Sequence, residues 1–144
     1  MSTKMRVLGA AVAASALLLP ATASSATAAP DAARAGKSFA TVLNLDGAKL
    51  QLCKVSIDGG AKYRVFARLN NVNGSGETGG RVKVQKDGKN TKQTWYSGMI
   101  PKGRVSAVGS VVVPDRPGYR LEVSAFQSQM GNGGTRGLVR IKPC

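Results

Sequence analysis

The sequence predicts an all-β fold: an antiparallel β-sandwich of about seven or eight strands, immunoglobulin-like in its general plan, with one disulfide. Two observations predict it. Short runs of alternating apolar and polar residues recur along the chain, separated by Gly, Asn and Asp. No segment carries apolar residues at helical spacing over three turns. The strand order stays open, because the second cysteine is the last residue and the Cys-Trp-Cys spacing of true immunoglobulin domains is missing.

The predicted strands follow one another with turn residues between them. They cover residues 38–45, 48–57, 61–70, 80–86, 91–97, 104–113, 119–127 and 135–142. The reversals fall at Asp46-Gly47, at Asp58-Gly59-Gly60, at Asp87-Gly88 and between Pro114 and Gly118. Asp and Gly tolerate the positive φ angles of tight turns, and Asp-Gly is a preferred two-residue hairpin loop. The predicted β-sandwich domain therefore spans residues 38–144.

The third predicted strand, AKYRVFARLN, carries the clearest alternation. One face holds Tyr63, Val65, Ala67 and Leu69, and the other holds Lys62, Arg64, Phe66 and Arg68. The first face is suited to a core. The second places three cations and a phenylalanine in solvent, which raises the question of what contacts them.

Cys53 and Cys144 are the only two cysteines. In an exported protein a disulfide between them is the expected state, because free thiols do not persist in oxidising surroundings. Closing so long a loop is worth about 4 to 5 kcal/mol in the chain-entropy model. Two free thiols, or an intermolecular bridge, are the alternatives.

Residues 1–28 are interpreted as a cleaved signal peptide. Lys4 and Arg6 precede an apolar run over residues 7–19, which is shorter than the roughly 20 residues that span a bilayer. Ala26-Thr27-Ala28 then supplies a small-residue cleavage site. The alanine-rich leader resembles those of proteins exported by high-GC Gram-positive bacteria. The remaining 116 residues, with 19 basic and 7 acidic side chains, are expected to be secreted and extracellular, with no membrane insertion after cleavage.

Residues 29–37, APDAARAGK, form the predicted flexible N-terminal arm, because they show no period and have little to bury. The first strand follows directly and is expected at a sheet edge. There main-chain hydrogen bonds would supply affinity for a protein partner, and the side chains of Phe39, Thr41 and Leu43 would supply selectivity. The alternative is that the arm is a spacer left after signal cleavage.

The residue inventory argues against an enzyme. The chain has no histidine, the commonest general base and metal ligand, and no Ser in a G-x-S-x-G pattern. Asp46, Asp58 and Asp87 are explained by turns. No cofactor or metal is predicted, and a carboxylate-dependent hydrolase is kept only as the last alternative.

Two further motifs have structural interpretations. Residues 74–79, GSGETG, match G-x-G-x-x-G, but the next residues read as a strand and not as the helix that a dinucleotide site needs, so we expect a hairpin loop. Trp95 belongs to the richest aromatic pair, Trp95-Tyr96. It is interpreted as core filler, with a contact residue as the alternative.

Basic residues alternate with apolar ones in three predicted strands. They are Lys62, Arg64, Arg68, Arg81, Lys83, Arg136, Arg140 and Lys142. If these strands share a sheet, the cations form one basic face for an anionic cell-envelope polymer. Nucleic acid is disfavoured, because no aromatic series is interleaved to stack bases. The alternative is a solvated face that keeps strand edges soluble.

The leading hypothesis is a small secreted non-catalytic β-sandwich that binds another secreted or cell-surface protein. It would act as an adaptor, an inhibitor or an accessory subunit of an extracellular assembly. The alternative is a binder of polyanions through the basic face. Both fit a chain whose net charge is +14 before signal removal.

Overall fold

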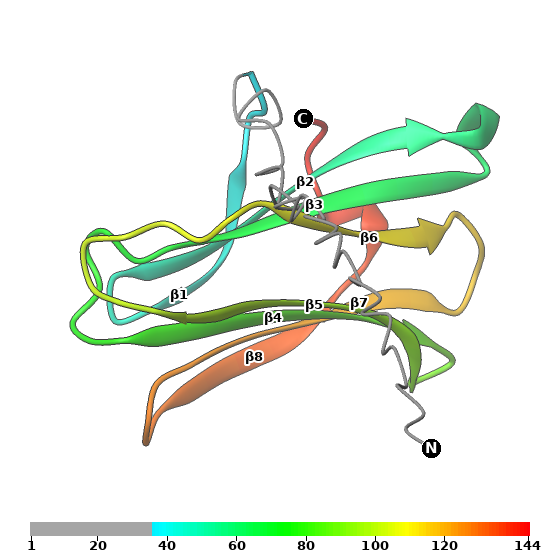
Figure 1. Cartoon of the computed structure of the whole chain (residues 1–144). Coiled ribbons are helices and arrows are strands. Elements are labelled where there is room, and N and C mark those ends of the chain that lie inside the picture. The colour runs from blue at the N-terminus through cyan, green and yellow to red at the C-terminus, as the bar shows by residue number, and fades with distance from the viewer. Residues whose placement is uncertain (1–35) are drawn as a thin grey trace, which may run out of the picture.

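The computed structural model describes residues 36–144, which form two four-stranded antiparallel sheets packed as a sandwich (Figure 1). The predicted fold class and the Cys53–Cys144 disulfide are confirmed. The predicted signal peptide and the predicted arm up to residue 35 lie outside the described residues. Within residues 36–144, no helix has the length and apolar character needed to cross a membrane.

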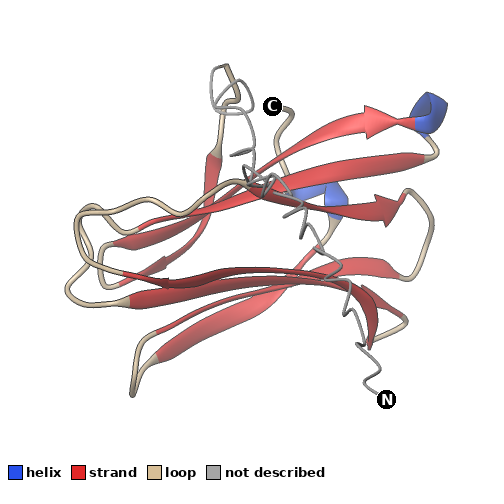
Figure 2. Cartoon of the chain, viewed as in Figure 1, coloured by secondary structure: helices blue, strands red, loops and turns tan. Residues whose placement is uncertain are grey.

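Figure 2 shows that strands dominate the two layers. The strands are β1 (Ala40–Leu45), β2 (Ala48–Ile57), β3 (Lys62–Asn70), β4 (Thr78–Lys86), β5 (Lys89–Ile100), β6 (Gly109–Pro114), β7 (Tyr119–Phe126) and β8 (Gly131–Arg136). Sheet A has the order β1-β2-β3-β6, and sheet B has the order β5-β4-β7-β8. Short 3-10 turns lie at Asp58–Gly60 and Leu138–Arg140. We call the face of each sheet that packs on the other sheet its inner face, and the opposite one its outer face.

The predicted Asp-Gly turns form as expected. Asp46 and Gly47, between β1 and β2, have φ angles of 49° and 85°, and Asp87 and Gly88, between β4 and β5, have φ angles of 50° and 78°. These left-handed values match the twist of a two-residue hairpin. Position 47 also requires glycine for steric reasons, because a Cβ at Gly47 would lie 2.0 Å from the carbonyl oxygen of Asn73.

The core lies between the inner faces and follows the alternation read from the sequence. In β3, Val65, Ala67 and Leu69 are at most 1% exposed, whereas Lys62 and Arg64 are exposed. Each fully buried Val or Leu contributes about 1.5 to 3 kcal/mol. The other main core residues are Leu43, Leu50, Leu52, Val82, Val84, Val111, Val113, Leu121, Val123, Leu138 and Ile141.

The disulfide holds the C-terminal segment beside β2. The Cα atoms of Cys53 and Cys144 are 4.9 Å apart. The main chain of Lys54 in β2 accepts a hydrogen bond from the amide of Cys144 (3.0 Å) and donates one to the carbonyl of Lys142 (3.0 Å). The C-terminal segment therefore pairs with β2 at Lys54, just beyond the start of β1 at Ala40, and Figure 1 shows the C-terminus beside β2.

The last predicted strand, residues 135–142, is wrong in position. Strand β8 ends at Arg136, and the chain then turns through its 3-10 segment. Three of the six residues of β8 are glycines, which carry no side chain and therefore show no alternation in the sequence. Consequently Arg136, Arg140 and Lys142 do not share a strand face.

The sixth predicted strand begins too early. Residues 104–108 lie in the connection that leads from sheet B to sheet A, where Val105 makes only an isolated bridge with Asn70. The buried Ser106 explains the misleading alternation. Its hydroxyl accepts a hydrogen bond from the amide of Leu69 (2.8 Å), so a polar residue occupies an inward position.

Candidate partner-binding surface

The predicted basic residues do not form one face, because their strands belong to different sheets. Strand β3 lies in sheet A, whereas β4 and β8 lie in sheet B. The outer face of sheet A therefore carries Lys62, Arg64 and Arg68, and that of sheet B carries Arg81 and Lys83. The two groups of cations lie on opposite sides of the sandwich.

Several of these cations already have partners within the chain. Lys62 pairs with Asp58 (2.8 Å), and Lys83 lies 3.8 Å from Glu122. The guanidinium of Arg68 donates to the side-chain oxygen of Gln51 (2.8 Å). Some of the predicted basic residues therefore make contacts that stabilise the fold itself.

The first strand lies at the edge of sheet A, as expected, but its three predicted partner residues are placed differently. A β-bulge between Thr41 and Leu43 breaks the alternation, so Thr41 is exposed while Leu43 is only 6% exposed and lies in the core. Phe39 packs against Arg68, whose guanidinium carbon is 4.3 Å from its ring centre. Of the three side chains, Thr41 alone is exposed.

The main chain of β1 is also partly engaged. Its carbonyl at Val42 accepts a hydrogen bond from Arg136 (3.2 Å), and its carbonyl at Asn44 accepts one from Asn132 (3.4 Å). Both donors come from β8, the neighbouring edge of sheet B. These two bonds close this side of the sandwich and leave less of the β1 edge for strand addition.

Residues 37–39, just before β1, contact side chains on the outer face of sheet A. The ammonium of Lys37 lies 4.3 Å from the ring centre of Phe66, and Arg68 covers Phe39 as described above. Exposed cation–π contacts of this kind contribute about 0.5 to 1 kcal/mol each. The phenylalanine that the sequence placed in solvent, Phe66, is therefore contacted by the chain itself.

The outer face of sheet B carries an aromatic group with no such cover from the described residues. We call Arg81, Tyr96, Met99 and Phe126 the aromatic patch. They come from β4, β5 and β7, which are neighbours in the sheet. The rings of Tyr96 and Phe126 stack with centres 6.0 Å apart and planes 17° apart. The guanidinium carbon of Arg81 lies 5.7 Å and 5.5 Å from the two ring centres.

Gly79 makes the aromatic patch possible. It lies opposite Phe126 in one neighbouring strand and opposite Met99 in the other. A Cβ at Gly79 would lie 2.6 Å from Phe126 and 3.0 Å from the sulfur of Met99. Because the glycine leaves this space, both side chains lie over β4. Tyr96 and Met99 nevertheless remain 48% and 38% exposed.

Trp95 points the other way from its neighbour Tyr96. It is partly buried and packs against the core, in agreement with its interpretation as core filler. On the facing strand β6, a Cβ at Gly109 would lie 2.1 Å from the indole ring. Trp95 therefore joins the sheets, whereas Tyr96 faces outward.

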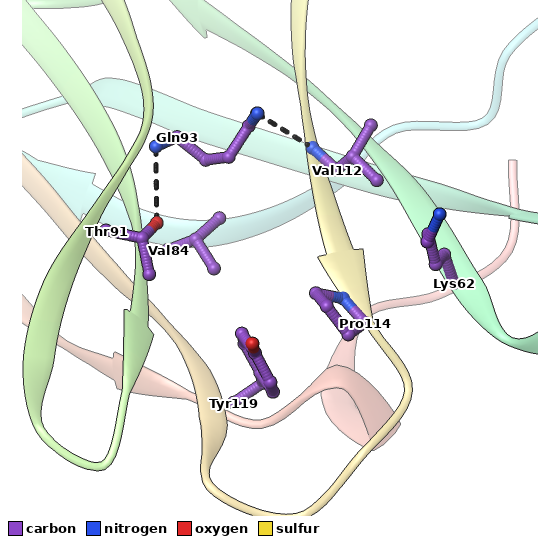
Figure 3. Close-up of a pocket in the computed structure, with 7 residues that line it drawn as sticks. All are labelled: Lys62, Val84, Thr91, Gln93, Val112, Pro114 and Tyr119. Carbon is purple, nitrogen blue, oxygen red and sulfur yellow. Dashed lines mark hydrogen bonds between the residues drawn. The ribbon is translucent and has the colours of Figure 1, made fainter.

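A cleft of about 270 Å³ opens at the edge where β5 and β6 meet (Figure 3). Gln93 of β5 bridges the two sheets here by accepting a hydrogen bond from the amide of Val112 (3.4 Å). Val84, Pro114 and Tyr119 form apolar walls. The volume of the cleft is smaller than that of most ligand pockets, which is about 300 to 1,000 Å³.

Sequence reasoning missed Asn71, which fixes the GSGETG loop. Its side chain is buried and donates to the carbonyls of Gly76 (2.8 Å) and Ile100 (2.7 Å). Gly74 packs directly on it, because a Cβ there would lie 1.8 Å from the side-chain oxygen of Asn71. Strand β4, and not a helix, follows this loop at Thr78.

Comparisons with protein-family models, with curated proteins and with solved structures found no match. Within the described part of the chain, no three His, Cys, Asp or Glu side chains gather where they could hold a metal ion.

Proposed function

We propose that this chain is a small, exported, non-catalytic β-sandwich that binds another secreted or cell-surface protein through the aromatic patch. It would serve as an adaptor, an inhibitor or an accessory subunit. The observation that carries the proposal is the stack of the exposed Tyr96 on the partly buried Phe126, with Arg81 against both rings.

The composition of the patch supports a protein partner. Tyr, Phe, Met and Arg are the residues enriched in the centres of protein–protein interfaces, where a few such side chains carry most of the binding energy. The net charge of the chain does not supply this specificity, because long-range charge mainly raises association rates.

The patch is also rigid, which lowers the entropic cost of binding. Its four side chains come from hydrogen-bonded strands, and three of them, Arg81, Tyr96 and Phe126, contact one another. A side chain that is already ordered loses less of the roughly 0.5 to 1.5 kcal/mol that immobilisation costs. Met99 adds a flexible thioether that can adapt to the partner at the border of the rings.

Binding of an anionic cell-envelope polymer is the second candidate, supported by the excess of 21 basic over 7 acidic residues. Its contacts would be distributed over both outer faces and not over one. Such binding would weaken steeply with added salt, whereas a contact centred on aromatic rings would not.

The test is comparative affinity capture from culture supernatant of the source organism, with the tagged mature protein and its Tyr96→Ala and Phe126→Ala variants as baits. Val55→Ala is the matched control, because Val55 is 42% exposed and lies in sheet A. We expect a protein that the wild type and the control retain at 150 to 300 mM salt, roughly one to two times physiological ionic strength, and that both patch variants lose. Equal retention by all four baits would assign the contact to another surface, such as the arm or the β1 edge.

A further inference from the structure

A second surface on the outer side of sheet B has a different chemistry. It is a recess of about 370 Å³ lined by Arg120 of β7, Thr135 of β8, and Gly137 and Arg140 after β8. It opens where β7 begins and β8 ends. Phe126 of the aromatic patch lies six residues further along β7, roughly 20 Å away at about 3.3 Å per residue. The recess is therefore separate from the proposed protein contact.

The two arginines of the recess lack an acidic partner within the described chain. The ion pairs found in residues 36–144 are Lys62–Asp58 and Lys83–Glu122. Glu122 is the nearest carboxylate in the strand register, directly opposite Thr135. It is engaged by Lys83 (3.8 Å) and by the amide of Gln85 (2.7 Å). Two arginines thus line one recess, and neither takes part in an ion pair within residues 36–144.

We propose that this recess binds a tetrahedral oxyanion, the phosphate or sulfate group of a small molecule or of a polymer. Each guanidinium presents a planar fork of N–H donors that matches two oxygens of such a group, and the Thr135 hydroxyl adds one more donor. A carboxylate has only two oxygens and would satisfy one fork, whereas phosphate and sulfate offer oxygens to both. Gly137 leaves room for the ion, because a Cβ there would meet only Val139 at 4.0 Å.

The polar lining argues against an apolar occupant. All three side chains that line the recess carry hydrogen-bond donors, and the fourth residue is glycine. Like charges that line a common recess raise its positive potential and increase the local concentration of anions. The proposal does not depend on the protein-binding role, because it uses none of the residues of the aromatic patch.

The experiment is a titration of the ¹⁵N-labelled mature protein with inorganic phosphate and with sulfate, followed by amide chemical shifts at constant ionic strength set by chloride. We expect saturable shifts at Thr135 and Gly137. The double variant Arg120→Gln with Arg140→Gln should bind at least roughly tenfold more weakly. Arg104→Gln removes an exposed arginine from the β5–β6 connection and is the control; it should change the affinity less than about twofold.

A second titration with short-chain polyphosphate identifies the source of the group. Loss of polyphosphate binding in the double variant but not in Arg104→Gln assigns the recess to polymer-borne phosphate, even where free phosphate binds too weakly to saturate. Shifts that grow without saturation for polyphosphate as well as for the free anions, or that chloride reproduces, overturn the proposal. So does polyphosphate binding that both variants weaken equally, because that result describes diffuse charge. Unchanged spectra outside the substituted positions show that each variant is folded.

Discussion

The two outer faces of the sandwich use the same cation–aromatic contacts in different ways. On sheet A, the pairs join the sheet to the segment just before β1, with Lys37 on Phe66 and Arg68 on Phe39. On sheet B, Arg81, Tyr96 and Phe126 all belong to the sheet itself. The first arrangement covers its aromatic rings with the chain, and the second leaves Tyr96 48% exposed. Sheet A thus uses these contacts for its own structure, whereas sheet B leaves Tyr96 open to solvent, which is the basis for proposing the partner contact there.

The largest expected effect is on the side of sheet A, where the disulfide holds the C-terminal segment. Replacing both Cys53 and Cys144 by Ser should lower the free energy of unfolding by about 3 to 5 kcal/mol, because the unfolded chain regains the entropy of a 91-residue loop. Denaturant unfolding without reducing agent measures this loss. A loss below about 1 kcal/mol would show that the disulfide does little to hold the sandwich together.

Substitution of the neighbours Trp95 and Tyr96 by Ala should lower stability to different extents. Trp95→Ala removes a side chain that packs between the sheets, and we expect it to cost about 2 to 4 kcal/mol, since Trp95 is only partly buried. Tyr96→Ala removes an outward side chain together with its stack on Phe126, and should cost no more than about 1 kcal/mol. Thermal and denaturant melts of the two variants compare them directly. A larger loss for Tyr96→Ala would mean that the aromatic patch is structural.

A smaller effect is expected from the segment that covers sheet A. Phe39→Ala should destabilise by about 1 kcal/mol through loss of the Arg68 contact and of partly buried ring surface. It should leave capture of the protein partner unchanged. If Phe39→Ala instead abolishes capture while the melting temperature is unchanged, the β1 edge and not sheet B is the contact.

Much of this fold can be read from local sequence. The alternation in β2, β3 and β7 and the Asp-Gly turns place these strands within a residue or two of their positions. The position of strand β8 is predicted wrongly because its glycines show no alternation. The start of β6 is predicted too early because the buried Ser106 falls at a polar position of an apparent alternation. Both errors arise where the polarity of a residue does not indicate whether its position faces the core or the solvent.

The candidate surface could not be predicted in the same way. Tyr96 and Phe126 are 30 residues apart in the sequence and meet only because β5, β4 and β7 are neighbours. Strand order is a property of the whole chain and is not contained in any one alternation. Gly79 was read as a loop residue of GSGETG, yet its function in the structure is to leave space under Phe126. The predicted single basic face is wrong for the same reason, because the alternation within each strand does not show that the cations lie on two different sheets.

The most direct test of the account is the affinity of the captured partner for the Tyr96→Ala variant, measured by calorimetry beside the wild type and the Val55→Ala control. The account predicts that Tyr96→Ala weakens binding by at least about 2 kcal/mol, roughly 30-fold in Kd, in a variant that is still folded at the temperature of the measurement. Val55→Ala, on sheet A, should bind within about twofold of the wild type. Equal affinity of Tyr96→Ala and wild type, with both proteins folded, would contradict the claim that sheet B presents the partner-binding surface.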